Sequence, residues 1–227
     1  MQAVILAAGR GTRMGSLVEN IPKPMLQVNG KNLLEYKLDA LPDEVQEVIF
    51  IVGYKGEVIR NYFGSEFGGR RISYVEQEVI DGTAGALWRA RDLLHDRFVV
   101  MMGDDIYAAD DVRACIANDD WSLVVQATDS ERAGGAVEVT ADQQITGITE
   151  GVHGGRRFAS TSLFVLDMRL FEFPMLPKAE GSTEFGLPQT VVAASQQSGI
   201  PFYAVDCSFW LQITAPEDLE KASELLK

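Results

Sequence analysis

Strands that alternate with helices fill the first half of the sequence, and this pattern limits the possible folds most strongly. Four apolar runs have the length of buried strands: residues 2–7, 47–52, 71–75 and 97–102. Three segments with helical spacing of apolar residues lie between them: residues 31–41, 55–63 and 83–94. Parallel strands joined by helices need right-handed crossovers, which place helices on both faces of the sheet. We therefore expect an α/β chain with a mostly parallel central sheet.

The pattern changes after Trp121, where the apolar runs become shorter and alternate with polar residues. These runs are separated by glycines and lie at residues 122–127, 135–140, 144–149 and 158–166. They predict antiparallel additions to the sheet in the C-terminal half. Two further helices are expected at 185–198 and 216–226. Because no internal repeat or long linker interrupts the sequence, we expect one domain over residues 1–227.

The N-terminal segment is basic, whereas the chain as a whole is acidic. The net charge of −13 argues against a general affinity for nucleic acid or an anionic membrane. Residues 1–31 nevertheless carry four lysine and arginine residues and a single acidic one. A locally basic segment on an acidic protein indicates a small anionic ligand. The two cysteines form no metal-ligand spacing, and no apolar run is long enough to span a membrane, so we expect a soluble cytoplasmic protein.

A glycine-rich loop follows the first predicted strand, with the sequence LAAGRGTRM over residues 6–14. Gly9 and Gly11 allow backbone amides to approach an anion closely, and Arg13 can form paired hydrogen bonds to phosphate oxygens. Lys23 adds a point charge between two prolines. Ligands of such sheets bind beyond the carboxyl ends of the strands. The same rim should therefore hold residues 7–14, 77–82 and 103–105, and the loop indicates a polyphosphate site.

Two other glycine-rich phosphate motifs fit this loop less well. The Walker A loop ends in Gly-Lys-Ser/Thr, which is absent here. The dinucleotide-binding fingerprint has its third glycine where this chain has Met14, and it needs an acidic residue after the second strand, where Val52-Gly53 stands. A Rossmann-type reductase is therefore a distant alternative.

The loop and several later segments together resemble the sugar-phosphate nucleotidyltransferases, which join a nucleoside triphosphate (NTP) to a sugar 1-phosphate. The similar segments span almost the whole chain: LAAGRGTRM…PKPMLQVNGKNLLEY, FIVGYKGEVIRNYFG, EQEVIDGTAGAL, MMGDDI and FWLQITAPEDLEKA. The resemblance implies a Rossmann-like nucleotidyltransferase fold, with a nucleotide-binding half over residues 1–120 and an acceptor-binding half over 121–227. It leaves open whether the protein is a homo-oligomer.

The resemblance also implies roles for individual residues. The implied nucleotide contacts are Leu6, Ala7, Ala8, Gly9, Gly11, Thr12, Arg13, Gln77, Gly82 and Thr83. Arg13 would hold the triphosphate, and Gln77 and Gly82 would contact the base. The implied acceptor contacts are Lys23, Glu150, Ser160 and Glu184. Asp104 would hold Mg²⁺, with Gln212 as a weak second ligand, and Arg13, Lys23 and Asp104 would be the catalytic residues.

The chemistry of such a transfer suits these residue types. The acceptor phosphate is already a nucleophile, so the protein needs no nucleophilic side chain. In-line attack at the α-phosphorus requires positioning and charge neutralisation, which cations, amides and a carboxylate-bound Mg²⁺ supply. Both histidines, His95 and His153, can then be bystanders. We interpret Asp105 as a helix cap or as a residue that orients its neighbours.

Three positions depart from the family pattern, and they concern the acceptor more than the nucleotide. Gln212 stands where the family has an aspartate as the second metal ligand, and Asp206 is too far along the chain to replace it. Glu150 is followed by Gly151 instead of a lysine, whose charge Arg156 or Arg157 could supply. Ser160 and Ser162 replace Asn and Gly. Two alternatives stay open: a cytidylyltransferase that acts on an alcohol phosphate such as phosphocholine, and a nucleotide-binding regulatory homologue with weak or no catalysis.

Overall fold

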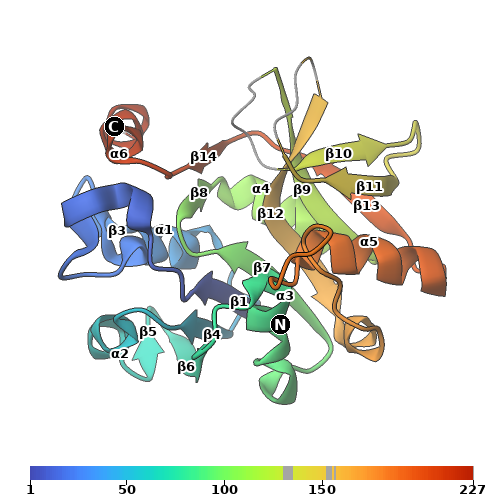
Figure 1. The fold of residues 1–227 in the computed structure, drawn as a ribbon. Helices are drawn as coiled ribbons and strands as arrows, with labels where there is room; N and C mark the ends of the chain where they lie inside the picture. Colours follow the sequence, from blue (N-terminus) through green and yellow to red (C-terminus); the bar gives the residue numbers. More distant parts are fainter. Residues whose placement is uncertain (130–134, 152–154, 156, 227) are drawn as a thin grey trace.

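The computed structural model describes residues 1–129, 135–151, 155 and 157–226. Within these ranges, ten strands form one mixed sheet, with β11-β10-β12-β7-β1-β4-β6-β5 as its main path (Figure 1). Its central strands are β1 (Gln2–Ala7), β4 (Glu47–Val52), β6 (Arg70–Glu76) and β7 (Arg97–Met102). All neighbours among these four are parallel, which confirms the prediction for the first half of the chain.

Helices cover both faces of this sheet, as the crossover rule requires. The apolar side chains of α3 (Gly82–Trp88) and α5 (Leu187–Ser198) join the core on one face. Those of α1 (Leu33–Ala40), α2 (Gly56–Phe63) and α4 (Ala109–Ala117) join the core on the other face. Because both faces are buried, β1 is apolar at almost every position instead of alternating.

The C-terminal half adds antiparallel strands, as expected. These strands are β9 (Trp121–Thr128), β10 (Ala136–Val139), β11 (Ile145–Thr149) and β12 (Arg157–Asp167). The strand β12 runs antiparallel to β7, β9 and β10. The sequence did not predict β13 (Phe202–Asp206), which lies parallel to β9 at the side of the sheet.

One predicted helix is shorter than its sequence pattern suggests. The segment 83–94 forms α3 only as far as Trp88, and a 3₁₀ turn follows at Arg91–Leu93. The side chain of Gln2 holds the end of this turn, because its amide donates to the carbonyl of Leu93 at 2.9 Å and accepts from the backbone N–H of His95 at 2.9 Å. The tighter turn also lets Leu94 reach the core.

Short elements surround the carboxyl ends of the central strands. A two-stranded sheet pairs β8 (Asp105–Tyr107) with β14 (Trp210–Gln212), and a hairpin pairs β2 (Gln27–Val28) with β3 (Lys31–Asn32). Two 3₁₀ segments, η1 (Thr12–Val18) and η2 (Lys23–Met25), follow β1. The last helix, α6 (Pro216–Leu225), packs beside the β2–β3 hairpin and shares a small core with η1. The edge strand β5 (Glu66–Phe67) and the 3₁₀ segment η4 (Met168–Glu172) complete the elements.

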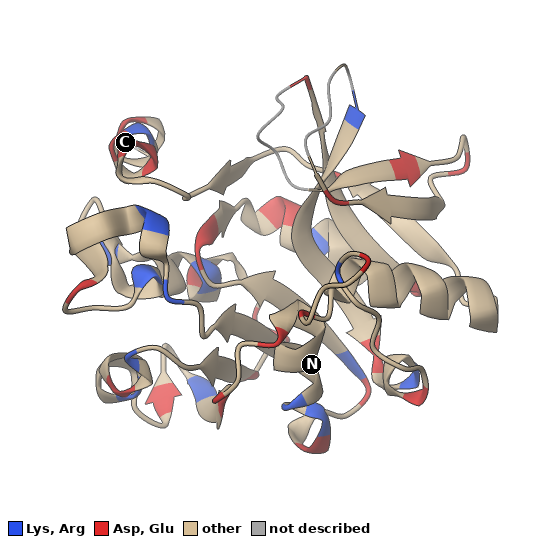
Figure 2. Ribbon diagram, in the orientation of Figure 1, with Lys and Arg blue, Asp and Glu red and all other residues tan. Residues whose placement is uncertain are grey.

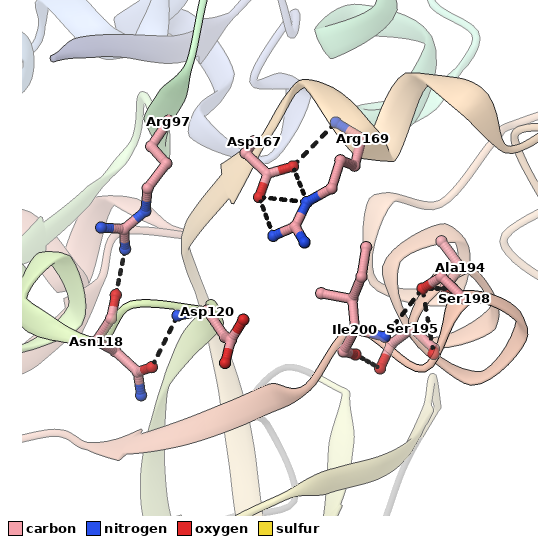
Figure 3. A network of polar contacts seen from close by, with 9 residues as sticks. All are labelled: Arg97, Asn118, Asp120, Asp167, Arg169, Ala194, Ser195, Ser198 and Ile200. Atoms are coloured by element: carbon pink, nitrogen blue, oxygen red, sulfur yellow. Dashed lines mark hydrogen bonds and ion pairs between the residues drawn. The ribbon is translucent and has the colours of Figure 1, made fainter.

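At the opposite end of β7, polar side chains pair with one another (Figure 3). Arg169 donates to both carboxylate oxygens of Asp167, and Arg97 donates to the carbonyl oxygen of Asn118. Both of these arginines are therefore bound within the chain. None of the helices in the described ranges has the length and apolar composition that crossing a bilayer requires.

Candidate functional site

Two adjoining cavities open at the carboxyl ends of β1, β6 and β7. The smaller has a volume of about 210 Å³, and the larger about 330 Å³. Leu6, Gly9 and Met102 line both of them. The rim expected from the strand order therefore exists, and the three predicted segments meet there.

The glycine-rich loop forms one wall of the smaller cavity. Gly11 has φ +63° and stands at the start of η1. A Cβ atom there would lie 2.7 Å from Cβ of Lys23, so only glycine fits without displacing the lysine. The buried Met14 anchors η1 below the loop, and its backbone N–H donates to the carbonyl of Gly11 at 2.9 Å. The loop is thus shaped around the stem of Lys23.

An ion pair between Lys23 and Asp104 lies in the smaller cavity. Lys23 Nζ is 2.6 Å from Asp104 Oδ2, and the two side chains are 8% and 31% exposed. Gly103 fixes the position of Asp104, because its N–H donates to the carbonyl of Leu6 at 2.9 Å and a Cβ would lie 2.8 Å from the same oxygen. Thr12 and Arg13 line the same cavity. A partly buried lysine, an arginine and a carboxylate thus share one small space.

The chain as a whole carries acidic residues on most elements, including β8, α4 and α6 (Figure 2). The segment from residue 1 to 31 contains only Glu19 among acidic residues. The smaller cavity therefore takes most of its positive groups from this segment. This arrangement favours an anionic ligand in that cavity.

Behind Asp104 lies a buried polar cluster that the sequence did not reveal. Asp105 Oδ2 accepts from Trp210 Nε1 at 3.0 Å and from Tyr107 Oη at 3.4 Å. Lys37 is fully buried, and its Nζ atom has no hydrogen-bond partner among the described residues. Burial lowers the pKa of Lys37 to about 8 although Asp105 and Asp104 oppose the shift. Burial also raises the pKa of Asp105, and the charge of Asp104 adds to that effect.

Asp105 therefore does not act as a helix cap, which was one of its two interpretations. It lies within β8, and α4 begins only at Ala109. Its partners are instead Tyr107 of the same strand and Trp210 of β14. The sequence signal was weak, because a carboxylate next to Asp104 looks the same in a capping turn and in a buried strand.

The larger cavity holds the residues predicted to contact the base and the acceptor. Predicted residues that line it are Leu6, Ala8, Gly9, Gln77, Gly82, Thr83, Glu150, Ser160, Glu184 and Gln212. Predicted residues that line the smaller cavity are Leu6, Ala7, Gly9, Gly11, Thr12, Arg13, Lys23 and Asp104. Every predicted site residue therefore lines one cavity or the other. Their roles stay predictions.

Lys178 and Gln189 also line the larger cavity, and the sequence did not single them out. Lys178 Nζ lies 3.9 Å from Glu184 Oε2, and its backbone N–H donates to the carbonyl of Glu184 at 2.8 Å. Gln189 Oε1 is buried without a hydrogen-bond partner in the described part of the chain. A lysine at this place could compensate for the lysine that is missing after Glu150.

Of the other residues that the sequence raised, Ser162 lines the larger cavity, and the rest lie elsewhere or outside the described residues. Arg157 begins β12 and is not among the described residues that line the two cavities. Asp206 ends β13, where it pairs with Val125 of β9, and it lines neither cavity in the described structure. Arg156 and His153 lie outside the described residues.

The donor set suits a magnesium ion that arrives with phosphates more than a metal held by protein alone. Among the described residues, no three His, Cys, Asp or Glu side chains gather into a metal site. Asp104 faces the smaller cavity, whereas Gln212 lines the larger one and is paired with Asp105 across β8 and β14. Mg²⁺ commonly keeps several waters and binds through one or two carboxylates plus substrate phosphates. The single carboxylate of Asp104, in a cavity suited to a polyphosphate, matches this mode of Mg²⁺ binding.

Comparison with known proteins agrees with this geometry. The family model described as nucleotidyl transferase matches residues 2–227. A UTP–glucose-1-phosphate uridylyltransferase, AglF of Haloferax volcanii, is 31% identical over 100% of this chain and 97% of its own length. The bifunctional protein GlmU of Methanocaldococcus jannaschii is 27% identical over 100% of this chain, which spans about half (54%) of that relative.

A solved structure shares the fold at lower sequence identity. The inositol-1-phosphate CTP transferase of T. maritima superposes with a TM-score of 0.79 and 22% identity, over 99% of this chain and 94% of its own. The family model covers nearly the whole sequence, and the AglF relative is similar along almost its entire length. The chain therefore belongs to the nucleotidyl transferase family.

Proposed function

We propose that this nucleotidyltransferase transfers a nucleoside monophosphate from an NTP to a sugar 1-phosphate, giving an NDP-sugar and pyrophosphate. The observation that carries the proposal is the Lys23–Asp104 pair, 2.6 Å apart, in a cavity walled by the glycine-rich loop. Such a space offers cations, amides and a carboxylate to a triphosphate. The full-length similarity to a uridylyltransferase that acts on glucose 1-phosphate supports this acceptor class.

The residues of the smaller cavity would act on the triphosphate. Backbone amides from Gly9 to Thr12 would bind its oxygens, and Arg13 would draw charge from the departing pyrophosphate. Lys23 would exchange its bond with Asp104 for bonds to the α-phosphate and to the acceptor phosphate. The attacking oxygen belongs to the acceptor phosphate, which loses no proton at neutral pH and therefore needs no general base.

The residues of the larger cavity would hold the base and the acceptor. Gln77 and Gly82 would contact the base, and Thr83 would line the same wall. Glu150, Ser160 and Glu184 would bind hydroxyls of the acceptor sugar. These groups line the larger cavity, whereas the Lys23–Asp104 pair lines the smaller one, and Leu6, Gly9 and Met102 form the boundary that both cavities share. A nucleotide and an acceptor could thus meet at that boundary.

A divalent ion, which we propose to be Mg²⁺, would bind through Asp104. When bound, it would neutralise charge on the α-phosphate during attack. Gln212 could add a neutral oxygen from the other cavity. Because a neutral amide cancels none of the charge of the ion, the site would depend on the phosphates of the NTP for most of its affinity. An enzyme that consumes NTPs would act in the cytoplasm.

A phosphate panel tests this function. Purified protein is incubated with Mg²⁺, each NTP in turn, and either sugar 1-phosphates or alcohol phosphates such as phosphocholine, and pyrophosphate release is measured. We expect release with at least one pair of NTP and sugar 1-phosphate. Release only with alcohol phosphates would favour a cytidylyltransferase of that kind, and NTP binding without any release would favour a regulatory homologue.

A further inference from the structure

The side-chain amide of Gln77 is held in one orientation. Its Nε2 atom donates to Asp81 Oδ1 at 2.9 Å and to the carbonyl oxygen of Gly82 at 3.1 Å. Both partners are oxygen acceptors, so the end of the amide that faces them must be the NH₂ group. Its two hydrogens are then in use. The carbonyl Oε1 of Gln77 receives no hydrogen bond from any described residue.

Arg89 holds the carboxylate of Asp81 in turn. Its two terminal nitrogens donate to Oδ1 at 2.9 Å and to Oδ2 at 3.0 Å, and one of them also donates to the carbonyl of Gly85 at 2.6 Å. Burial alone would raise the pKa of Asp81, but the hydrogen bonds from Arg89 and Gln77 outweigh it and lower the pKa. Asp81 is therefore an ionised acceptor at neutral pH. Gly85 leaves room for it, because a Cβ there would lie 2.2 Å from Oδ1.

The backbone around this chain of contacts is also fixed. The N–H of Phe185 donates to the carbonyl of Asp81 at 2.7 Å, and the N–H of Ala84 donates to the carbonyl of Phe185 at 3.1 Å. The backbone at Asp81 therefore cannot move without breaking contacts between α3 and the segment before α5. The orientation of Gln77 is built into the packing.

Gln77 lines the larger cavity and is only 4% exposed. An amide in that position can present a ligand with either an N–H donor or a carbonyl acceptor, depending on which way it turns. Here the donor end is occupied, so the ligand meets an acceptor. A buried acceptor gains most from a ligand that donates to it, and it penalises a ligand that offers a second acceptor.

We propose that Asp81 and Arg89 are positioning residues that present Gln77 to the nucleotide only as a hydrogen-bond acceptor, so that this cavity selects among NTPs by the position of an N–H group on the base. The inference rests on the proposed function for the place of the base. The donor can be a ring N–H, as in uracil, thymine or guanine, or an exocyclic amine, as in cytosine or adenine. The same fixed acceptor serves both, and methylated bases distinguish them.

The test measures dissociation constants of the Mg²⁺ complexes of five nucleotides, UTP, dTTP, GTP, CTP and ATP, by calorimetry. Wild type should prefer one base. Asp81→Leu removes the acceptor at similar volume, and it should lower the preference over the next-best base by on the order of tenfold, the value of one neutral hydrogen bond. Asp81→Asn should keep part of the preference, because its carbonyl oxygen can take the place of Oδ1.

Three further measurements separate positioning from general damage. Pyrophosphate with Mg²⁺, which has no base, should bind to wild type and Asp81→Leu with the same affinity. Arg89→Met should weaken base preference in wild type but add little in the Asp81→Leu background, since both act through Gln77. Arg91→Met is the matched control, because it removes a nearby arginine outside these contacts, and it should change neither affinity nor preference.

A methyl group on the donating N–H identifies the donor. The analogue of the preferred NTP that lacks this hydrogen should bind wild type about tenfold more weakly. It is the N3-methyl form for uracil or thymine, the dimethylamino form for cytosine or adenine, and either the N1-methyl or the dimethylamino form for guanine. The difference in affinity between the parent NTP and its methylated analogue should be smaller in Asp81→Leu. The proposal is overturned if wild type has no base preference, if no methylated analogue binds more weakly than its parent NTP, if Asp81→Leu keeps the full preference, or if it loses pyrophosphate binding as well. Because these are binding measurements, they stand even if no acceptor supports turnover, which would count against the proposed function alone.

Discussion

Gly82→Ala should destabilise the protein far more than an ordinary glycine substitution. Gly82 has φ +98°, and a Cβ there would lie 2.3 Å from the carbonyl oxygen of Phe185 and 2.6 Å from its nitrogen. Adopting a positive φ costs a non-glycine residue about 1–2 kcal/mol. The clash is with backbone, so the segment at Phe185 must move and its two hydrogen bonds to Asp81 and Ala84 must weaken. Each is worth about 1 kcal/mol, which brings the total to about 3–4 kcal/mol.

Gly181→Ala is the matched control for this prediction. Gly181 has φ +73° and belongs to the same region before α5, but a Cβ there would meet nothing within 4 Å. Gly181→Ala should lower the free energy of unfolding only by the cost of a positive φ, about 1–2 kcal/mol. Urea unfolding followed by circular dichroism measures both variants, and the midpoints can be compared if the slopes agree. If Gly82→Ala costs no more than Gly181→Ala, the close contact between Gly82 and Phe185 does not stabilise the fold.

Three further changes test the cation, the metal site and the buried lysine assigned to this region. Lys23→Met should lower kcat/KM by on the order of 10²-fold while the circular dichroism spectrum is unchanged, because it removes a cation facing the transferring phosphates; normal turnover would refute that role. Gln212→Asp should lower the Mg²⁺ concentration needed for half-maximal rate, since a carboxylate binds Mg²⁺ more tightly than an amide, and an unchanged midpoint with unchanged acceptor KM would make Gln212 a bystander. Burial lowers the pKa of Lys37 from 10.5 to about 8, so the unfolded state binds the extra proton between these values and the free energy of unfolding should rise with pH across that window. In Lys37→Met this part of the rise should be missing, and identical pH profiles would contradict the assigned burial cost.

The sequence predicted the central sheet well because its strands have a clear pattern of apolar residues. Strands such as β1 are buried on both faces and therefore read as unbroken apolar runs, and helices with an apolar stripe separate them. By contrast, β13 is only five residues long and follows a proline, so local composition did not mark it. The 3₁₀ turn after α3 is held by Gln2, which is 91 residues away from Leu93. Sequence patterns cannot reveal such a contact.

In the candidate site, too, some residues could be predicted from local sequence and others could not. The loop around Gly9 and Gly11 was predictable, because few other uses explain glycines and cations together at that spacing. Lys37, however, looks like an ordinary helix residue in the sequence, and only the packing shows that its ammonium group is buried beneath Asp104 and Asp105. Lys178 likewise reaches the larger cavity from a segment without a recognisable motif. For both lysines, contacts with distant parts of the chain determine their place in the site, so local sequence could not predict it.

The central claim is that an acceptor phosphate attacks the α-phosphorus of an NTP in the space between the two cavities. Oxygen labelling tests this directly: a sugar 1-phosphate with ¹⁸O in its phosphate group is converted, and both products are weighed by mass spectrometry. The account predicts that all of the label stays in the NDP-sugar, that pyrophosphate carries none, and that Asp104→Asn forms neither product at a comparable rate. Label in the pyrophosphate, a nucleoside diphosphate as the second product, or full activity of Asp104→Asn would contradict it.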